Sequence, residues 1–262
     1  MNPPSSQHTV IDRLSIEVHP DRAAAGRAAA RAVATHLRDV VASRGGARVI
    51  FACAPSQDEF LAALIDPAIC GITVPWSKLT AFHMDDYVGL RASQPQSFRH
   101  YLQSHLLQHV PMGKFHPLPA ERPDATAVCD EYSRLLSEKP IDLICLGIGE
   151  NGHIAFNDPP VDFDDPAPVK IVELDEACRH QQVADGCFPS FDAVPPKAVT
   201  LTIPVFRQAR RLSVHVFGPR KAAAVRATLR DPISPRCPAS ILRTHPWAGL
   251  YLDPAAAAGA AL

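Results

Sequence analysis

Four short segments of this chain combine groups that can move protons or bind an anion, and each follows a run of apolar residues. They are CAPSQ (53–57), MDDYVGL (84–90), GENGHIAFNDP (149–159) and GPRK (218–221). Among their side chains we single out three carboxylates, a histidine, an amide and a lysine: Asp85, Asp86, Asp158, His153, Asn151 and Lys221. In an open parallel sheet, ligands bind where loops leave the carboxyl ends of the strands. We therefore expect the four segments to meet at one pocket.

The third segment predicts an acid–base histidine inside a glycine-rich loop. Gly149 and Gly152 allow a tight turn and a close approach of the backbone to a ligand. His153 follows them, and imidazole, with an ordinary pKa of about 6.5, suits proton transfer near neutrality. Asn151 and Asp158 flank the histidine and are placed to fix its tautomer. The alternative is a glycine turn whose histidine only caps a helix.

The second segment places two carboxylates side by side. Asp85 and Asp86 follow the apolar run LTAFHM. A carboxylate whose pKa is raised by burial or by a like-charged neighbour is suited to taking a proton from carbon. A solvated turn would also accommodate two aspartates.

The fourth segment indicates an anion site. Gly218-Pro219 opens a helix, so free backbone N–H groups and Lys221 lie where a phosphate could dock. The alternative is an ordinary proline-started helix with a solvated lysine.

Strands and helices alternate along the chain. RLSIEVH predicts a strand, and Asp21 then precedes an Ala-rich helix that ends at Gly45-Gly46. Further apolar runs are RVIFACA, LTAFHM, IDLICLGIG, VTLTIP, RLSVHVF and GLYLD; helical segments are EFLAALI, SFRHYLQSHLL, the region of CDEYSRLLSEK, and RKAAAVRATLR. Runs that are apolar on both faces favour a mostly parallel sheet covered by helices on both sides. We expect one open, doubly wound α/β domain spanning residues 1–262, with no structure assigned to the last nine residues, PAAAAGAAL.

Composition limits the partners. The 262 residues carry a net charge of -1, so no overall field favours nucleic acid or an anionic membrane. The start MNPPSSQHTVIDRL lacks a signal pattern, and no apolar run reaches the ~18 residues that span a bilayer, so we expect a cytoplasmic protein. Seven cysteines without a CxxC pair, and histidines without HExxH spacing, predict neither disulfides nor a metal site. The sequence leaves open whether the chain forms a homo-oligomer.

The four segments resemble those of the glucosamine-6-phosphate deaminases, also called isomerases, of the sugar-phosphate isomerase and 6-phosphogluconolactonase superfamily. The matching motifs are FHMDDYVGL, SFRHYL, GIGENGHIAFNDP, and KAVTLTIPV followed by GPRKAAAV. Their order and spacing extend the resemblance over about residues 47 to 253, nearly the whole chain.

The resemblance implies ring opening, isomerisation and deamination of glucosamine 6-phosphate to fructose 6-phosphate and ammonia, a step of amino-sugar catabolism, without a metal or organic cofactor. His153 would carry the ring-opening proton, supported by Asn151 and Asp158. Asp85 would move a proton from carbon 2 to carbon 1.

The resemblance also implies a binding site for the sugar phosphate. Arg179 and Lys221 match the family's phosphate ligands, and residues 160–190 would form a mobile lid. The remaining residues that we expect to bind substrate or its phosphate are Ser56, Gln57, Asp86, Gly149 and Gly152.

Three positions depart from the family pattern. CAPSQ replaces a Thr-Gly-rich phosphate loop, and because Pro55 lacks an N–H, phosphate contact there rests on Ser56 and Gln57. Asn151 stands where many members have Asp, and Asp158 is one methylene shorter than the usual Glu.

Two alternatives stay open at this point. A 6-phosphogluconolactonase-like hydrolase would share the fold and a GxxxDGH loop, although the MDDYVGL turn favours the isomerase. A sugar-phosphate-binding protein without catalysis is suggested by Pro55, Asn151 and Asp158.

Overall fold

The computed structural model describes residues 6–184 and 186–262. The first five residues, part of the stretch without a signal pattern, and residue 185 of the predicted lid lie outside this description. The main sheet has eight strands, in the spatial order β1 (Gln7–Ile11), β2 (Leu14–Val18), β11 (Ala248–Leu252), β10 (Leu212–Val216), β7 (Leu143–Leu146), β3 (Ala47–Phe51), β4 (Leu79–His83) and β6 (Lys114–His116). All neighbours are parallel except β1 and β2. The predicted mostly parallel, doubly wound fold is confirmed.

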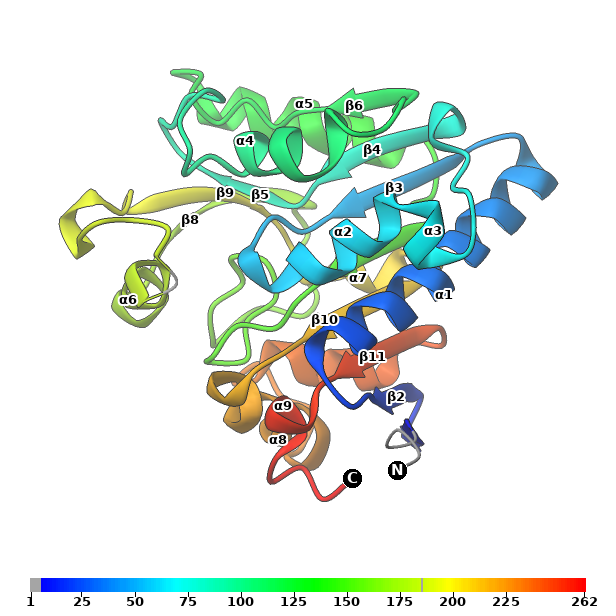
Figure 1. Cartoon of the computed structure of the whole chain (residues 1–262). Helices are drawn as coiled ribbons and strands as arrows, with labels where there is room; N and C mark the ends of the chain where they lie inside the picture. The colour runs from blue at the N-terminus through cyan, green and yellow to red at the C-terminus, as the bar shows by residue number, and fades with distance from the viewer. Residues whose placement is uncertain (1–5, 185) are drawn as a thin grey trace.

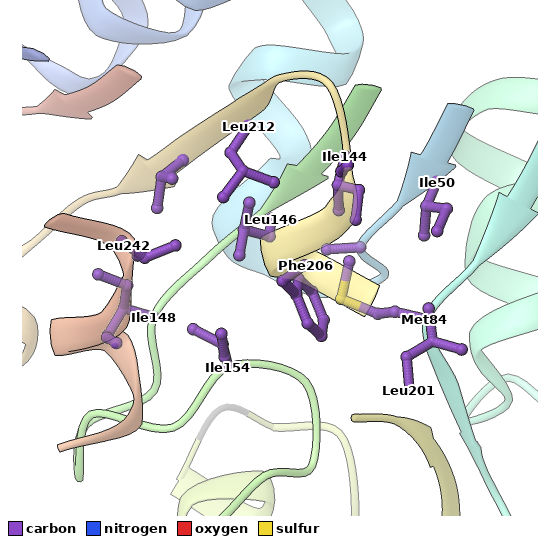
Figure 2. Close-up of a cluster of buried hydrophobic side chains, with 14 of the residues drawn as sticks. Ile50, Met84, Ile144, Leu146, Ile148, Ile154, Leu201, Phe206, Leu212 and Leu242 are labelled. Carbon is purple, nitrogen blue, oxygen red and sulfur yellow. The ribbon is translucent and has the colours of Figure 1, made fainter. Parts of the chain in front are cut away.

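Helices cover both faces of this sheet (Figure 1). The helices are α1 (Arg22–Arg44), α2 (Asp58–Ile65), α3 (Pro67–Cys70), α4 (Phe98–Leu102), α5 (Ala125–Ser137), α6 (Glu176–Ala184), α7 (Ile203–Gln208), α8 (Ala222–Arg230) and α9 (Pro254–Ala257). Because side chains alternate along a strand, Val49 and Phe51 of β3 pack toward α1 and α2, whereas Ile50 packs on the opposite face. Figure 2 shows that opposite face, where Ile144 and Phe206 join Ile50.

The first helix begins and ends as the sequence predicts. Asp21 accepts a hydrogen bond from the backbone N of Ala24 at 2.7 Å, and Gly45 ends α1 in the left-handed conformation with φ of 79°. A Cβ on Gly26 would lie 2.9 Å from the backbone carbon of Glu59, so this glycine lets α1 approach the beginning of α2. The start of α1 is thereby held beside the loop that follows β3.

A second sheet carries the segment VTLTIP, which the sequence pattern assigns to the same series of strands as the parallel sheet. This sheet is antiparallel and has the order β5 (Asp85–Tyr87), β9 (Lys197–Leu201) and β8 (Val169–Glu173). Asp85 pairs with Thr200, so part of the MDDYVGL turn is itself a short strand. Assigning VTLTIP to the parallel sheet is wrong. The strand part of this segment belongs to β9, whose backbone is hydrogen-bonded to β5 and β8.

The C-terminal segment has structure that the sequence did not predict. The first four residues of PAAAAGAAL form α9, and Ala256 and Ala260 are completely buried. No sequence pattern predicted the strands β1, β5, β6 and β8 either. Within residues 6–184 and 186–262, no helix has the length and apolar character to cross a membrane.

Candidate active site

The carboxyl ends of β3, β4, β7 and β10 meet at one cavity of about 170 Å³. Residues from all four predicted segments line it, and the central ones are Ser56, Gln57, Asp85, Gly149, His153 and Lys221. Segments far apart in the sequence therefore come together as the sheet topology predicts. Of the six side chains singled out by their type and spacing, Asp85, His153 and Lys221 line this cavity, whereas Asp86, Asn151 and Asp158 do not.

His153 belongs to a closely connected group of three side chains. Its Nδ1 lies 3.0 Å from Oδ1 of Asp158, so the shorter carboxylate reaches the imidazole. Nδ2 of Asn151 donates to the same oxygen at 3.0 Å, and Oδ1 of Asn151 accepts from the backbone N of His153 at 3.0 Å. An aspartate at position 151 could not donate to Asp158. The two departures from the family pattern thus complement each other.

The charge of Asp158 is favoured by these contacts. Burial raises the pKa of Asp158, but the hydrogen bond from Asn151, the close contacts with His153 and Cys178 and the charge of His153 together lower it below its ordinary value. The carboxylate is therefore ionised at neutral pH. It can hold the imidazole and stabilise it when it carries two protons.

Two glycines of this loop could not be replaced by a larger residue without strain: Gly149 because the His153 ring packs on it, and Gly152 because of its backbone conformation. A Cβ on Gly149 would lie 2.3 Å from Nε2 of His153, so the imidazole packs directly on the glycine. Gly152 has a φ of 84°, in the left-handed region, and its N donates to the carbonyl of Gly149 at 3.0 Å. The ring is positioned by the loop beneath it.

Asp85 lines the same cavity and is buried, with 5% of its surface exposed. Burial, reinforced by the neighbouring charge of Asp86, raises the pKa of Asp85 well above its usual range. Nδ1 of His83 donates to the backbone carbonyl of Asp85 at 2.9 Å, and Nε2 of His83 accepts from the N of Leu118 at 2.8 Å. Burial lowers the pKa of His83 to about 4, so a neutral histidine anchors the strand that carries Asp85.

Asp86 is directed away from the cavity, which differs from its predicted role in binding substrate. Its carboxylate is completely buried, pairs with Nε of Arg99 at 2.8 Å and accepts from Oγ of Ser97 at 2.9 Å. The backbone N of Phe98 also donates to it at 3.1 Å. Successive residues of a strand point to opposite sides, so Asp85 faces the cavity while Asp86 fastens the start of α4.

Three cationic side chains line the cavity: Arg22, Arg220 and Lys221. Arg22 pairs with Glu59 at 2.6 Å, and Arg220 pairs with Glu150 at 3.3 Å. Only Lys221 was predicted. Arg220 adjoins it in the sequence and could have been included, whereas Arg22 enters through the position of α1 and carries no local signal.

Arg179 occupies a different place from its predicted phosphate site. Its Nη2 donates to the carbonyls of Phe191 and Val194 at 2.9 and 3.1 Å, and its guanidinium lies 3.8 Å from the centre of the Phe191 ring. These contacts hold it within the predicted lid segment and the turn that follows. In this arrangement it does not line the cavity.

The predicted lid, residues 160–190, contains β8 and α6, and α6 stands outside the main sheet in Figure 1. Gln181 and Gln182 of this helix line the cavity. Oε1 of Gln182 accepts from the Tyr87 hydroxyl at 2.7 Å, and Oε1 of Gln181 accepts from the N of Glu150 at 3.1 Å. Sequence reasoning missed both glutamines, because only the docking of α6 brings them to the site.

A buried carboxylate, a separate histidine–carboxylate pair and nearby cations around one cavity define an acid–base site for a small anion. The chain matches the family model of glucosamine-6-phosphate isomerases/6-phosphogluconolactonase over residues 20–248, and it belongs to that family.

Curated relatives support this assignment. The chain is 35% identical over 182 residues to the glucosamine-6-phosphate deaminase of Lactobacillus delbrueckii subsp. bulgaricus, which covers 70% of this chain and 76% of the relative. It is 37% identical over 185 residues to the enzyme of the same name from Listeria welshimeri, covering 70% and 77%.

Solved structures show the same fold. A monomeric glucosamine-6-phosphate deaminase of the NagB superfamily superposes with a TM-score of 0.85 at 28% identity, covering 92% of this chain and 98% of that one. A 6-phosphogluconolactonase from Shewanella baltica gives a TM-score of 0.74 at 18% identity, covering 94% and 99%. The second match speaks for the fold alone.

Proposed function

We propose that the chain is an enzyme that converts glucosamine 6-phosphate and water to fructose 6-phosphate and ammonia, in cytoplasmic amino-sugar catabolism. The observation that carries this proposal is the presence in one cavity of two separate proton-transfer groups: buried Asp85, and His153 held 3.0 Å from Asp158. Two separate groups suit a reaction in which one proton is transferred between oxygen atoms and another between carbon atoms.

His153 opens the sugar ring by carrying a proton from the O1 hydroxyl to the ring oxygen. Asp158 and Asn151 orient it and stabilise its cationic form. Asp85 then takes the proton from carbon 2 and returns it to carbon 1, while one proton of the substrate's ammonium group passes to the carbonyl oxygen O1. These transfers leave a protonated imine at carbon 2 and a hydroxyl at carbon 1; one water then adds to carbon 2, and one ammonia leaves it.

The environment of Asp85 fits its role as carbon base. Its raised pKa makes the carboxylate a stronger base than an exposed aspartate. The substrate's amino group is cationic near neutrality, and a positive charge near Asp85 favours the ionised form that must accept the proton.

Ser56, Gln57, Arg22, Arg220 and Lys221 bind the phosphate in this proposal. Cations with amide and hydroxyl donors suit a dianion, and Gln57 and Ser56 supply donors that Pro55 cannot. Mobility of residues 160–190 and a phosphate contact by Arg179 remain part of the proposal. That contact requires Arg179 to leave the Phe191 and Val194 carbonyls.

The 6-phosphogluconolactonase alternative explains less of the site. Lactone hydrolysis needs an activated water but no proton transfer between carbons, so it gives a buried carboxylate at position 85 no task. The neighbouring carboxylate of Asp86 forms an ion pair with Arg99 and does not bind substrate in this arrangement.

The test is a product assay. The purified chain is incubated with glucosamine 6-phosphate, and we expect ammonia and fructose 6-phosphate in equal amounts; a parallel incubation with 6-phosphogluconolactone tests the alternative. Lactone hydrolysis without ammonia release, or sugar-phosphate binding without turnover, would refute the proposal.

A further inference from the structure

A thiol of the lid helix lies against the histidine–carboxylate pair. Cys178 of α6, His153 and Asp158 each offer one ligand atom, and these atoms all lie within 4.8 Å of one another. Cys178 is 1% exposed and His153 is 8% exposed. Among the described residues, this is the one group of three potential metal ligands of these types. Sequence spacing could not reveal it, because Cys178 reaches the site through the packing of α6.

Two buried polar atoms of this group have no hydrogen-bond partner. They are Nδ1 of His153 and Oδ2 of Asp158. The 3.0 Å contact between Nδ1 and Oδ1 of Asp158 is a close charge contact without hydrogen-bond geometry. Buried polar atoms in folded proteins nearly always have partners. A cation that binds nitrogen, oxygen and sulfur would supply a partner to both atoms and contact the neighbouring thiol.

We propose that His153, Asp158 and Cys178 form a binding site for Zn²⁺ that blocks the acid–base histidine. Imidazole nitrogen, carboxylate oxygen and thiolate sulfur are the ligands that Zn²⁺ takes in proteins, and a thiolate excludes Mg²⁺ and Ca²⁺. One carboxylate and one thiolate also supply two negative charges for the two positive charges of the ion. A buried site of this kind stays neutral overall, which limits the cost of taking charges out of water.

Zinc at this site would oppose catalysis. The ion occupies Nδ1 of His153 and separates the imidazole from Asp158, so the ring can no longer carry protons. It also ties α6 to the loop of residues 149–159. The inhibition rests on the proposed role of His153, whereas the binding does not.

Metal binding is measured on the purified chain with Zn²⁺ by calorimetry and with Co²⁺ by absorption. We expect one ion per chain and a thiolate-to-cobalt charge-transfer band. Cys178→Ser should abolish the band and weaken zinc binding by more than about 10-fold, since even outer-shell partners of metal ligands contribute 10–100-fold. Cys129→Ser is the matched control, because Cys129 is a buried cysteine of α5 in the main core. It should retain both signals.

Turnover of glucosamine 6-phosphate is then followed against added Zn²⁺, each variant relative to its own metal-free rate. The original chain and Cys129→Ser should be inhibited and should recover with a chelator, while Cys178→Ser should resist. Equal zinc affinity in Cys178→Ser, or no charge-transfer band in the original chain, would overturn the site. Band formation without inhibition would overturn the blocking role. A chain that binds the ion through Cys178 but never deaminates would refute the proposed function and leave the metal site standing.

Discussion

Nδ1 of His215 lies 2.8 Å from Oε1 of Gln57, so a buried histidine of β10 fixes an amide that lines the cavity. An amide oxygen only accepts, so Nδ1 carries the proton. Burial lowers the pKa of His215 to about 3, which keeps the ring neutral. Nε2 of Gln57 donates to Oγ of Ser56 at 3.2 Å. Both side chains line the cavity, and in the proposed function they donate to the phosphate.

His215→Phe should release this amide while keeping a ring against Phe60, whose centre lies 3.9 Å from that of His215. We expect KM for glucosamine 6-phosphate to rise about 10-fold with a smaller change in kcat, because the lost donor, worth about 1–1.5 kcal/mol, binds substrate and transition state alike. Ser213→Ala removes only the partner of Nε2, 2.8 Å away, and should change KM less. A kcat loss at constant KM would show that Gln57 does not serve binding.

Asp85→Asn should abolish the incorporation of solvent deuterium at carbon 1 and lower kcat by at least about 100-fold, in the range of a lost acid–base catalyst. The amide keeps the shape of the carboxylate but cannot take a proton. Sugar-phosphate binding should persist, since the cations of the site are unchanged. Exchange is followed by proton NMR, and retained exchange would assign the carbon base elsewhere.

Asn151→Asp should shift the acidic limb of the kcat profile to higher pH. The substitution removes the N–H that Asn151 donates to Asp158 at 3.0 Å and adds a like charge, and both effects raise the pKa of Asp158. In the original chain the pKa of Asp158 is lowered, so its negative charge supports His153 at pH values above that pKa and is lost as pH falls through it. In the variant this loss begins at higher pH. An unchanged acidic limb would show that Asp158 does not control the rate.

The parallel sheet and its four strand exits could be predicted because apolar runs and helix caps are local signals. Asp85 and His153 were found for the same reason: each follows such a run directly. The residue pattern alone could not tell which of two adjacent aspartates faces the cavity, because that depends on the pairing of Asp85 with Thr200 in the second sheet; the family resemblance assigned the carbon base to Asp85. Arg22 and Cys178 reach the site because the helices α1 and α6 pack beside it. The residues next to them in the sequence contain no pattern that predicts such a contact.

Asp253 connects the C-terminal helix to the predicted anion loop, and its replacement should separate stability from binding. Its Oδ1 accepts from the N of Gly218 at 3.0 Å and from the N of Ala256 at 2.8 Å. Asp253→Ala should lower the free energy of unfolding by about 0.5–2 kcal/mol through the lost helix cap, and it should raise KM because the Gly218 turn is no longer held. Asp124→Ala is the matched control, since Asp124 caps α5 through the N of Ala127 at 2.9 Å and does not line the cavity. Thermal unfolding and KM are measured for both. If both variants lose stability and neither changes KM, Asp253 serves only as a cap, and the Gly218 turn keeps its shape without it.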